Sequence, residues 1–254
     1  LQFVLVDKAV KAKAERGERL SPGETVIAGG YRWGKTDELL LRYGNQGLYT
    51  TSLFEFPKLT RTTYAKNTIE AGRSFLVGKH QGGKALLVLW KGMAQFLVNE
   101  AEAGRVYTTL IGPVSLSQEY NDNVKLFLSR QLLKTRHNET ISPNIKGKVP
   151  PQLNTRLTEE DIKILFEAHP DLNSLEPLIR DAMGDSALKL PPLFGLYSTL
   201  GADFVAASAD PDFGCLDLMT HVDLAKTEPK WLQFYFGKDL AARYMSAVAA
   251  QSNQ

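Results

Sequence analysis

Two charged residues, Glu70 and Arg73, stand three positions apart at the start of an apolar segment, in the run Ile69-Glu70-Ala71-Gly72-Arg73. A positioned carboxylate can take the proton from an attacking amine, and a guanidinium can hold a carboxylate through two hydrogen bonds. On a regular strand these two side chains point to opposite faces of the sheet. They can therefore serve one site only if Gly72 lies in a β-bulge.

The apolar segment continues to Val77 and is followed by a glycine-containing loop, residues 79–84. From residue 85 to residue 98 nearly every side chain is apolar, which predicts a buried helix with one solvent stripe at Lys84, Lys91 and Gln95. The first N–H groups of a helix lack internal partners and carry the positive end of its dipole, so they form a seat for a phosphate. By themselves, a strand, a glycine loop and a helix are more typical of a plain structural turn.

This stretch resembles the central motif of the GCN5-related N-acyltransferase superfamily, V-x-x-x-x-R-x-x-G-x-G/A, which wraps the phosphates of the acyl donor. Val77 starts the match, Gly82 occupies the usual arginine position, and Leu87 replaces the second small residue. These departures favour the single phosphate of an acyl carrier protein's phosphopantetheine arm over the pyrophosphate of coenzyme A. The resemblance implies the following donor-binding residues: Leu76, Val77, Gly82, Gly83, Lys84 and Ala85.

Residues 69–73 also resemble the E-x-G/S-R signature that opens the fourth strand in the acyl-carrier-protein-dependent branch of this superfamily. That branch includes the lyso-ornithine-lipid N-acyltransferases, often labelled hemolysin-like, the N-acyl amino acid synthases and, more distantly, the acyl-homoserine-lactone synthases. The resemblance implies an α/β fold with a mixed, mostly antiparallel central sheet, flanked by helices, whose fourth and fifth strands splay apart.

For catalysis, the same resemblance implies Glu70 as the base and Arg73 as the residue that orients Glu70 or the acceptor's carboxylate. A backbone N–H near Leu76 or Val77 would stabilise the oxyanion.

Two later segments carry the resemblance further. Residues 111–120 are similar to the G-x-V-S-x-S-x-x-Y run of the lipid-forming members. Residues 190–224 are similar to a P-x-L-x-x-Y-x-x-L-G-A helix followed by a strand, a D-P-D-F turn and a last strand. Pro113 has no N–H for a strand ladder, so we expect it where its strand leaves its neighbour and the donor arm inserts.

Three further polar residues are candidates for binding the acceptor: Arg32, Ser115 and Asp217. Arg32 could hold a carboxylate, and an ordinary surface ion pair is the equal alternative. Ser115 or Ser117 could face the thioester, although a helix cap is the simpler role for Ser117. Asp217 could hold a cationic acceptor, with a turn-capping or surface acid as the alternative.

Composition sets limits on the function. Thirty basic and 28 acidic residues give a net charge of +2, which does not point to nucleic acid. Cys215 is the single cysteine and the four histidines lack ligand spacing, so we predict no disulfide and no metal site. No run approaches 18 apolar residues, which predicts no membrane span and a cytoplasmic location.

The chain begins at Leu1 with an apolar run, and we expect one acyltransferase domain, residues 1–254, that lacks its true N-terminus. Residues 6–19 read as a helix with a basic outer face, either a solvated face or a contact with the inner surface of the cytoplasmic membrane. Gly29 and Gly30 predict a bulge or a close approach in a strand at residues 25–33.

Residues 37–44 are predicted to form that strand's partner across a short turn. The pattern also predicts helices at residues 118–136 and 174–183, a helix that Thr158 opens, and a mobile loop at residues 137–157.

The reaction favoured by the resemblance moves a 3-hydroxyacyl chain from acyl carrier protein to the α-amine of an amino acid, forming an aminolipid precursor. Ornithine is the favoured acceptor, with glycine and lysine left open, and no tightly bound cofactor is expected. Two alternatives remain: an acetyltransferase that uses coenzyme A on a small amine, and a non-catalytic module that binds acyl carrier protein or lipid.

Overall fold

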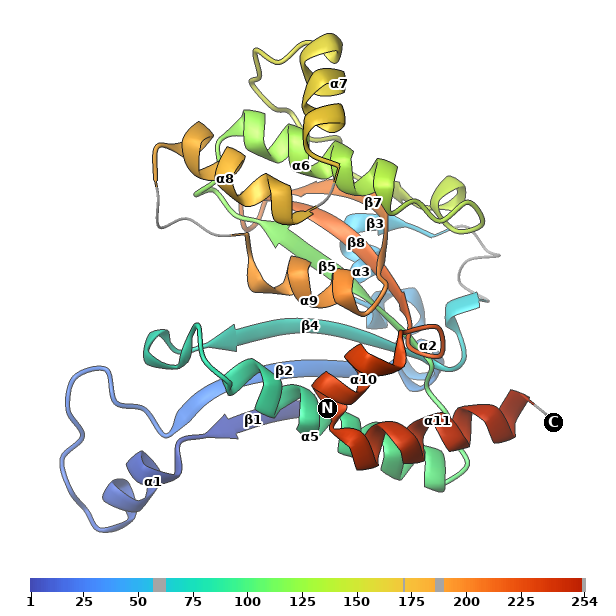
Figure 1. The fold of residues 1–254 in the computed structure, drawn as a ribbon. Helices are drawn as coiled ribbons and strands as arrows, with labels where there is room; N and C mark the ends of the chain where they lie inside the picture. Colours follow the sequence, from blue (N-terminus) through green and yellow to red (C-terminus); the bar gives the residue numbers. More distant parts are fainter. Residues whose placement is uncertain (57–62, 171, 186–189, 253–254) are drawn as a thin grey trace.

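The computed structural model describes residues 1–56, 63–170, 172–185 and 190–252 (Figure 1). Its strands are β1 Gln2–Val6, β2 Ile27–Lys35, β3 Phe54–Glu55, β4 Thr68–Leu76, β5 Thr109–Leu116, β6 Lys146–Gly147, β7 Asp203–Asp210 and β8 Cys215–Asp223. Its α-helices are α1 Lys8–Glu15, α2 Thr36–Tyr43, α3 Thr50–Leu53, α5 Ala85–Glu102, α6 Asp122–Thr135, α7 Glu159–Ala168, α8 Leu172–Met183, α9 Pro192–Thr199, α10 Pro229–Phe236 and α11 Lys238–Ser252. Short 3-10 helices are η1 Gly44–Gly47, η2 Gly78–His80 and η3 Ser142–Asn144.

The central sheet has six strands in the order β1-β2-β4-β5-β8-β7, and all neighbours run antiparallel except β4 and β5. The parallel pairing covers three positions, from Thr68 opposite Thr109 to Glu70 opposite Ile111, and the two strands then diverge (Figure 1). Pro113, two residues beyond Ile111, lines the cavity that opens between them. The predicted fold, a mostly antiparallel sheet flanked by helices with splayed fourth and fifth strands, is confirmed.

Glycines on β2 allow β4 to approach it closely. A Cβ on Gly29 would lie 2.5 Å from the side chain of Leu76, and a Cβ on Gly30 would lie 2.9 Å from the Phe75 ring. Neither space admits another side chain without a shift. The close approach predicted from these two glycines is therefore confirmed.

A β-bulge interrupts the ladder between β2 and β4, one residue later than expected. The register jumps between Gly72 and Phe75, so Arg73 and Ser74 together oppose the single residue Tyr31. Arg73 has a φ of 54°, in the left-handed region that residues other than glycine rarely adopt. Such strain persists only where the surroundings hold it, which is common at functional sites.

Helix α5 packs its apolar side on the first two strands through edge-to-face aromatic contacts. Phe3 and Trp33 of the strands meet Trp90 and Phe96 of α5 with ring centroids 5.8 to 6.3 Å apart. Such pairs contribute about 0.5–1.5 kcal/mol each beyond the area that they bury. The predicted solvent stripe of α5 is confirmed at these exposed residues: Lys84, Lys91 and Gln95.

Two predicted helix starts are confirmed. Helix α9 begins with Pro191 as its N-cap and Pro192 in the first position, where a missing N–H costs nothing. Its side chains Leu196 and Tyr197 are buried. Helix α7 begins with a capping box formed by Thr158 and an aspartate three residues later.

The strand predicted at residues 37–44 is wrong, because this segment lies in helix α2. Asp37 and Glu38 occupy the first turn, where the helix dipole favours acidic side chains. The Thr36 hydroxyl donates to the carbonyls of Tyr64 and Thr68 at 2.5 and 3.1 Å, which fixes the helix start against β4. The leucines that follow are good helix formers, so local propensity and this anchor favour the helix.

Three other predicted segments differ from the structure in their bounds or in their regular structure. The chain forms β1 up to Val6, and α1 begins after the N-cap Asp7, so the helix predicted at residues 6–19 is shorter. Helix α6 starts four residues later than predicted and is capped by Asn121, which leaves Ser117 free of the capping role. Residues 137–157, predicted as a loop, include η3 and strand β6, which pairs with β3, so part of this segment has regular structure. Among the described residues, no helix is both long and apolar enough to cross a bilayer.

Candidate active site

A cavity of about 420 Å³ opens at the point where β4 and β5 separate. We call it the central cavity. Strand β4 lines it with residues 72–74, including the bulge, and β5 lines it with residues 113–115. The titratable and hydroxyl-bearing residues that line it are Tyr31, Tyr49, Arg73, Ser74, Ser115, Ser117, Asp210, Cys215 and Asp217.

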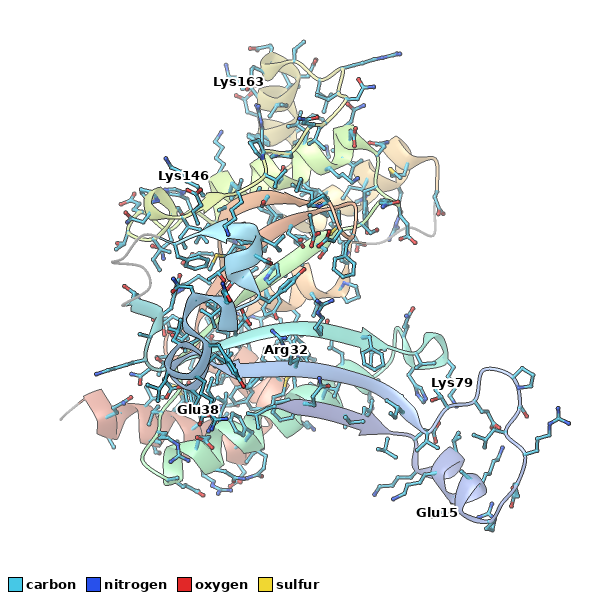
Figure 2. All side chains as sticks on the ribbon, turned by 180° about the vertical axis from the view of Figure 1, so that it is seen from behind. Glu15, Arg32, Glu38, Lys79, Lys146 and Lys163 are labelled. Atoms are coloured by element: carbon cyan, nitrogen blue, oxygen red, sulfur yellow. The ribbon has the colours of Figure 1, made fainter. Side chains whose placement is uncertain are left out.

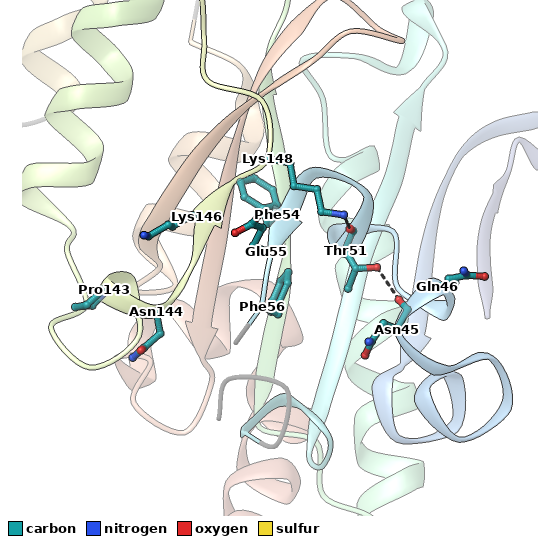
Figure 3. Close-up of a pocket in the computed structure, with 10 residues that line it drawn as sticks. All are labelled: Asn45, Gln46, Thr51, Phe54, Glu55, Phe56, Pro143, Asn144, Lys146 and Lys148. Carbon is teal, nitrogen blue, oxygen red and sulfur yellow. Dashed lines mark hydrogen bonds between the residues drawn. The ribbon is translucent and has the colours of Figure 1, made fainter. Parts of the chain in front are cut away.

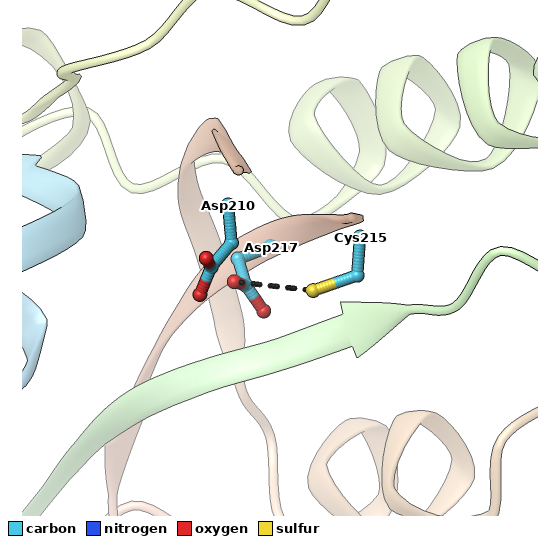
Figure 4. A group of neighbouring side chains, drawn as sticks. All are labelled: Asp210, Cys215 and Asp217. Atoms are coloured by element: carbon cyan, nitrogen blue, oxygen red, sulfur yellow. Dashed lines mark hydrogen bonds between the residues drawn. The ribbon is translucent and has the colours of Figure 1, made fainter. Parts of the chain in front are cut away.

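Two carboxylates from neighbouring strands meet in this cavity (Figure 4). Oxygen atoms of Asp210 and Asp217 and the thiol sulfur of Cys215 lie within 4.8 Å of one another. Asp217 accepts a hydrogen bond from the Ser115 hydroxyl at 2.5 Å and a longer one from the Cys215 thiol at 3.6 Å. Asp210 accepts from the Tyr49 hydroxyl at 2.9 Å.

Burial in the cavity alters the protonation of these groups. Burial raises the pKa of Asp217 above its usual value, and the nearby Asp210 carboxylate adds to this rise because two like charges repel. Burial and the Asp217 charge together raise the pKa of Cys215 to about 11. The thiol therefore stays protonated at neutral pH. The three groups are close enough to bind a metal ion, and the two carboxylates can also balance the positive charge of an amine.

A single guanidinium faces the carboxylates from β4. The Arg73 guanidinium carbon lies 4.8 Å from the centre of the Tyr49 ring and 5.2 Å from that of the Phe213 ring. Cation–π contacts on two sides hold the guanidinium in place without neutralising it. Within the part of the chain that the structure describes, Arg73 has no carboxylate within ion-pair distance, so it can bind an anionic group.

Glu70, the predicted base, lies outside the central cavity and is only 1% exposed. Its carboxylate accepts four hydrogen bonds. One comes from Arg32 at 3.0 Å, one from the Tyr49 N–H at 3.1 Å, and two from the N–H and hydroxyl of Thr50, each at 2.8 Å. Tyr49 contacts both predicted residues: its N–H donates to Glu70, and its ring lies against the Arg73 guanidinium.

Arg32 (labelled in Figure 2), a candidate for binding the acceptor's carboxylate, binds the carboxylate of Glu70 at 3.0 Å. Its partner is thus a protein side chain that is buried, and the pair differs from the surface ion pair that was the alternative.

A second cavity, of about 630 Å³, lies between the end of β4 and the start of α5. We call it the loop cavity. It is lined by three predicted donor-binding residues, Leu76, Gly82 and Gly83, and by Leu86 and Leu89 of α5. It shares these residues with the central cavity: Ser74, Pro191 and Leu193. The two cavities therefore lie next to each other at the bulge.

The backbone of the loop cavity offers several free donors. Lys84 is the N-cap of α5 and Ala85 is its first residue, and no side chain caps this end. The N–H of Val77 donates to Ala28 at 3.0 Å, so Val77 is not available for an oxyanion. Because N–H groups alternate sides along a strand, the N–H of Leu76 points away from β2, toward the gap.

The largest of the cavities described here, about 670 Å³, lies elsewhere, against the small sheet of β3 and β6 (Figure 3). Its walls include Phe54, Glu55, Lys146 and Lys148. The Lys148 ammonium is tied to the carbonyl of Thr51 at 2.6 Å. This cavity shares no lining residue with the central cavity and lacks its pair of carboxylates.

Sequence reasoning missed three residues of the central cavity: Tyr49, Asp210 and Cys215. Asp210 opens the D-P-D-F turn that the sequence displayed, and its carboxylate accepts the N–H groups of two turn residues, so the turn was the available signal. Tyr49 stands in an irregular connection between η1 and α3, where no pattern marked it. Cys215 was set aside because it is a lone cysteine.

Residues 9–91 match the family model of the acetyltransferase (GNAT) domain. The matched segment runs from α1 into α5 and includes the bulge and the glycine loop. Searches of curated proteins and of solved structures find no match. The match covers about a third of the chain. Together with the observed fold, it supports the GCN5-related N-acyltransferase superfamily and, at the level of function, a general N-acyltransferase.

Proposed function

We propose that this acyltransferase of the GCN5-related type moves an acyl chain, a 3-hydroxyacyl chain in the favoured case, from acyl carrier protein to the α-amine of an amino acid. One observation carries the proposal. The loop cavity, which suits a phosphopantetheine arm, and the central cavity, which suits an amino acid, meet at Ser74, Pro191 and Leu193. A thioester carbonyl and an amine that enter from the two sides would meet at this junction.

The loop cavity supports the donor side of the proposal. The free N–H groups at the start of α5 would bind the phosphate, because the helix dipole favours an anion there. Gly82 and Gly83 leave the backbone of the loop open to the arm. With no arginine in this loop, the single phosphate of an acyl carrier protein fits better than the pyrophosphate of coenzyme A. The N–H of Leu76 would donate to the oxyanion.

The charges of the central cavity support an acceptor with two amines. Asp210, Asp217 and Arg73 leave the cavity with one net negative charge. An amino acid with a second amine has the matching positive charge, whereas glycine would leave one carboxylate without a partner. Arg73 would bind the acceptor carboxylate, so ornithine or lysine is favoured over glycine.

Asp217 is our candidate for the base in this reaction, in place of Glu70. Its raised pKa brings it closer to that of an α-amine, which is about 7.7–8.0, and it lines the cavity. The amine nitrogen bonds to the carbonyl carbon and the carbon–sulfur bond breaks. The proton that Asp217 accepts from the amine returns to the departing thiolate. Glu70 would hold α3, β2 and β4 together through its four hydrogen bonds.

The proposed partners are acyl carrier protein and the inner surface of the cytoplasmic membrane. Val4, Ile27 and Phe75 on the first three strands of the sheet are apolar and about half exposed, at 51%, 47% and 52%. Such residues would favour contact with the membrane in which the lipid product collects. Flotation with lipid vesicles tests this contact, and a chain that stays at the bottom of the gradient would contradict it.

The reaction itself is tested by mass spectrometry of the products. The purified chain is mixed with 3-hydroxyacyl carrier protein and an equimolar pool of ornithine, lysine and glycine. Parallel reactions contain 3-hydroxyacyl-coenzyme A or acetyl-coenzyme A as donor. We expect N-acylornithine or N-acyllysine with the carrier protein as the best donor. Asp212→Asn, in the exposed turn beside the site, is the matched control for Asp217→Asn.

Each alternative has its own outcome. Acetylated small amines from acetyl-coenzyme A, without product from the carrier protein, would support the coenzyme A-dependent enzyme. Binding of acyl carrier protein with no product from any donor would support the non-catalytic module.

A further inference from the structure

A third cavity, of about 560 Å³, joins the junction of the other two. We call it the side cavity. It lies between the end of β5, helix α8 and the start of α9, and its lining residues are Ser115, Ser117, Glu119, Tyr120, Glu176, Leu190, Pro191 and Pro192. It shares Ser115 and Ser117 with the central cavity, Pro192 with the loop cavity, and Pro191 with both.

We propose that the side cavity binds the acyl chain of the donor. This inference rests on the proposed function. A thioester at the junction has three groups around it: the phosphopantetheine arm, the attacking amine and the acyl chain. The loop cavity leads to the start of α5 and the central cavity is charged, so the side cavity is the remaining path for an alkyl chain.

The lining of the side cavity suits this role. Leu190, Pro191 and Pro192 give it an apolar wall, and the Tyr120 ring adds to that wall. Of its two acids, Glu119 is exposed, and Glu176 pairs with Arg180 of its own helix at 3.0 Å. Glu119 can therefore stay hydrated, and Glu176 can keep its ion pair, when an alkyl chain binds. Each buried CH₂ group would contribute about 0.8 kcal/mol.

Ser117 stands where the 3-hydroxyl of the acyl chain would lie. This hydroxyl is two carbons beyond the carbonyl, and Ser117 lines both the central cavity and the side cavity. Ser115 already donates to Asp217, whereas the Ser117 hydroxyl has no hydrogen-bond partner among the residues that the structure describes. Ser117 is thus the specificity residue that distinguishes a 3-hydroxyacyl chain from a plain one.

The test measures equilibrium binding, which does not depend on turnover. Thioether analogues of acyl-pantetheine phosphate with 4 to 16 carbons would be titrated calorimetrically, with roughly 0.8 kcal/mol expected per buried CH₂ in the wild type. Leu190→Trp fills the side cavity, and Leu41→Trp, on the exposed face of α2, is the matched control. We expect Leu190→Trp to weaken binding of the longest chain by about 10- to 100-fold and that of the shortest by no more than about twofold.

The 3-hydroxyl is tested with paired hydroxylated and plain analogues. Ser117→Ala should reduce the preference for the hydroxylated analogue by about three- to tenfold without changing the affinity for the plain one. An affinity of Leu190→Trp that changes equally for all chain lengths, or not at all, would overturn the inference.

The outcome is separate from that of the proposed function. Chain-length-dependent binding that Leu190→Trp removes would support the side cavity even if no product formed from any donor. Products with a chain-length preference that Leu190→Trp leaves unchanged would overturn the side cavity and leave the proposed function standing.

Discussion

Two carboxylates of this sheet, Glu70 and Asp217, are equally buried, at 1% and 2% exposure, yet their surroundings differ. Glu70 accepts four hydrogen bonds, one of them from the cationic Arg32. Asp217 accepts one strong hydrogen bond, from Ser115, and faces a second carboxylate. The first charge is compensated and the second is not. Burial therefore does not identify a reactive acid; the set of donors around it does.

The position of each acid in the sheet explains this difference. Glu70 lies in the last position at which β4 pairs with β5, so its side chain is enclosed by α3 and β2. Asp217 pairs with Ser115 on β5, at a position where β5 has already diverged from β4. The space between these two strands forms the central cavity there. The splay thus separates the enclosed Glu70 from Asp217, which we propose as the base.

The largest effect is expected for Asp217→Asn, which removes the proposed base while keeping the size of the side chain. We expect acyl transfer to fall by about 10²- to 10⁴-fold. The measurement is kcat/KM for the acceptor, with Asp212→Asn as control. Equal activity of the two variants would remove Asp217 from the mechanism.

Glu70→Gln should lower stability, because it removes the charge from a buried carboxylate with four hydrogen-bond donors and takes the ion-pair partner from Arg32, whose side chain is 34% exposed. Loss of a hydrogen bond to a charged group costs about 1.5–3 kcal/mol, and the solvent around Arg32 reduces the penalty for its unpaired charge. Urea unfolding measures the free energy, with the exposed Glu119→Gln as control. A variant as stable as the wild type that makes no product would reverse the comparison and restore Glu70 as the base.

Arg73 can be tested by Arg73→Lys, which keeps the charge but loses the planar fork that binds a carboxylate. We expect KM for the amino acid to rise by about tenfold or more, since charged hydrogen bonds contribute about 1.5–3 kcal/mol. The affinity for the acyl donor should not change, which calorimetry with a donor analogue measures. A rise in the donor's dissociation constant, with KM for the amino acid unchanged, would contradict the assignment.

Stability should depend on pH through Asp217. Its pKa is raised in the folded state, so between the unfolded value, about 3.9, and the folded value the native protein binds more protons. The stability that this group contributes is present below the unfolded pKa and is lost as pH rises through the folded pKa. The amide of Asp217→Asn does not titrate, so this variant lacks that pH dependence. The Tm of Asp217→Asn should therefore rise relative to the Tm of the wild type as pH increases from 4 to 7.

Thermal unfolding at several pH values checks this. A constant difference in Tm between the two proteins would contradict a raised pKa. The same titration should appear as an acid limb in kcat/KM of the wild type, because only the carboxylate form accepts a proton.

The smallest effect on stability is expected for Arg73→Gly. Glycine adopts a φ of 54° without strain, so the substitution relieves a backbone strain of about 1–3 kcal/mol. The substitution also removes two cation–π contacts, which opposes this gain in stability. We expect a Tm within a few degrees of the wild type, together with loss of amino acid binding. A large fall in Tm would show that the guanidinium mainly holds Tyr49 and Phe213 in place.

The sequence by itself determined the features that depend on neighbouring residues. Pro191 and Pro192 fix the start of α9, Thr158 caps α7, and the apolar run after the glycine loop forms α5, because capping, dihedral limits and helical periodicity act within a few residues. The bulge was expected from Glu70 and Arg73, one residue away from where it lies. The helix at residues 37–44 was not predicted, because a short apolar run of that length fits a strand as well as a helix.

Only the tertiary structure decided which residues share a site. Arg73 and Asp217 are 144 positions apart, and they face one cavity because β5 leaves β4 after residue 111 and pairs with β8 along its whole length. Tyr49 contacts Arg73 and Asp210 from a connection without regular pattern. The sequence named Glu70 and Asp217 alike as acids, but the donors that surround a carboxylate come from distant segments, so the chemistry that distinguishes them exists only in the fold.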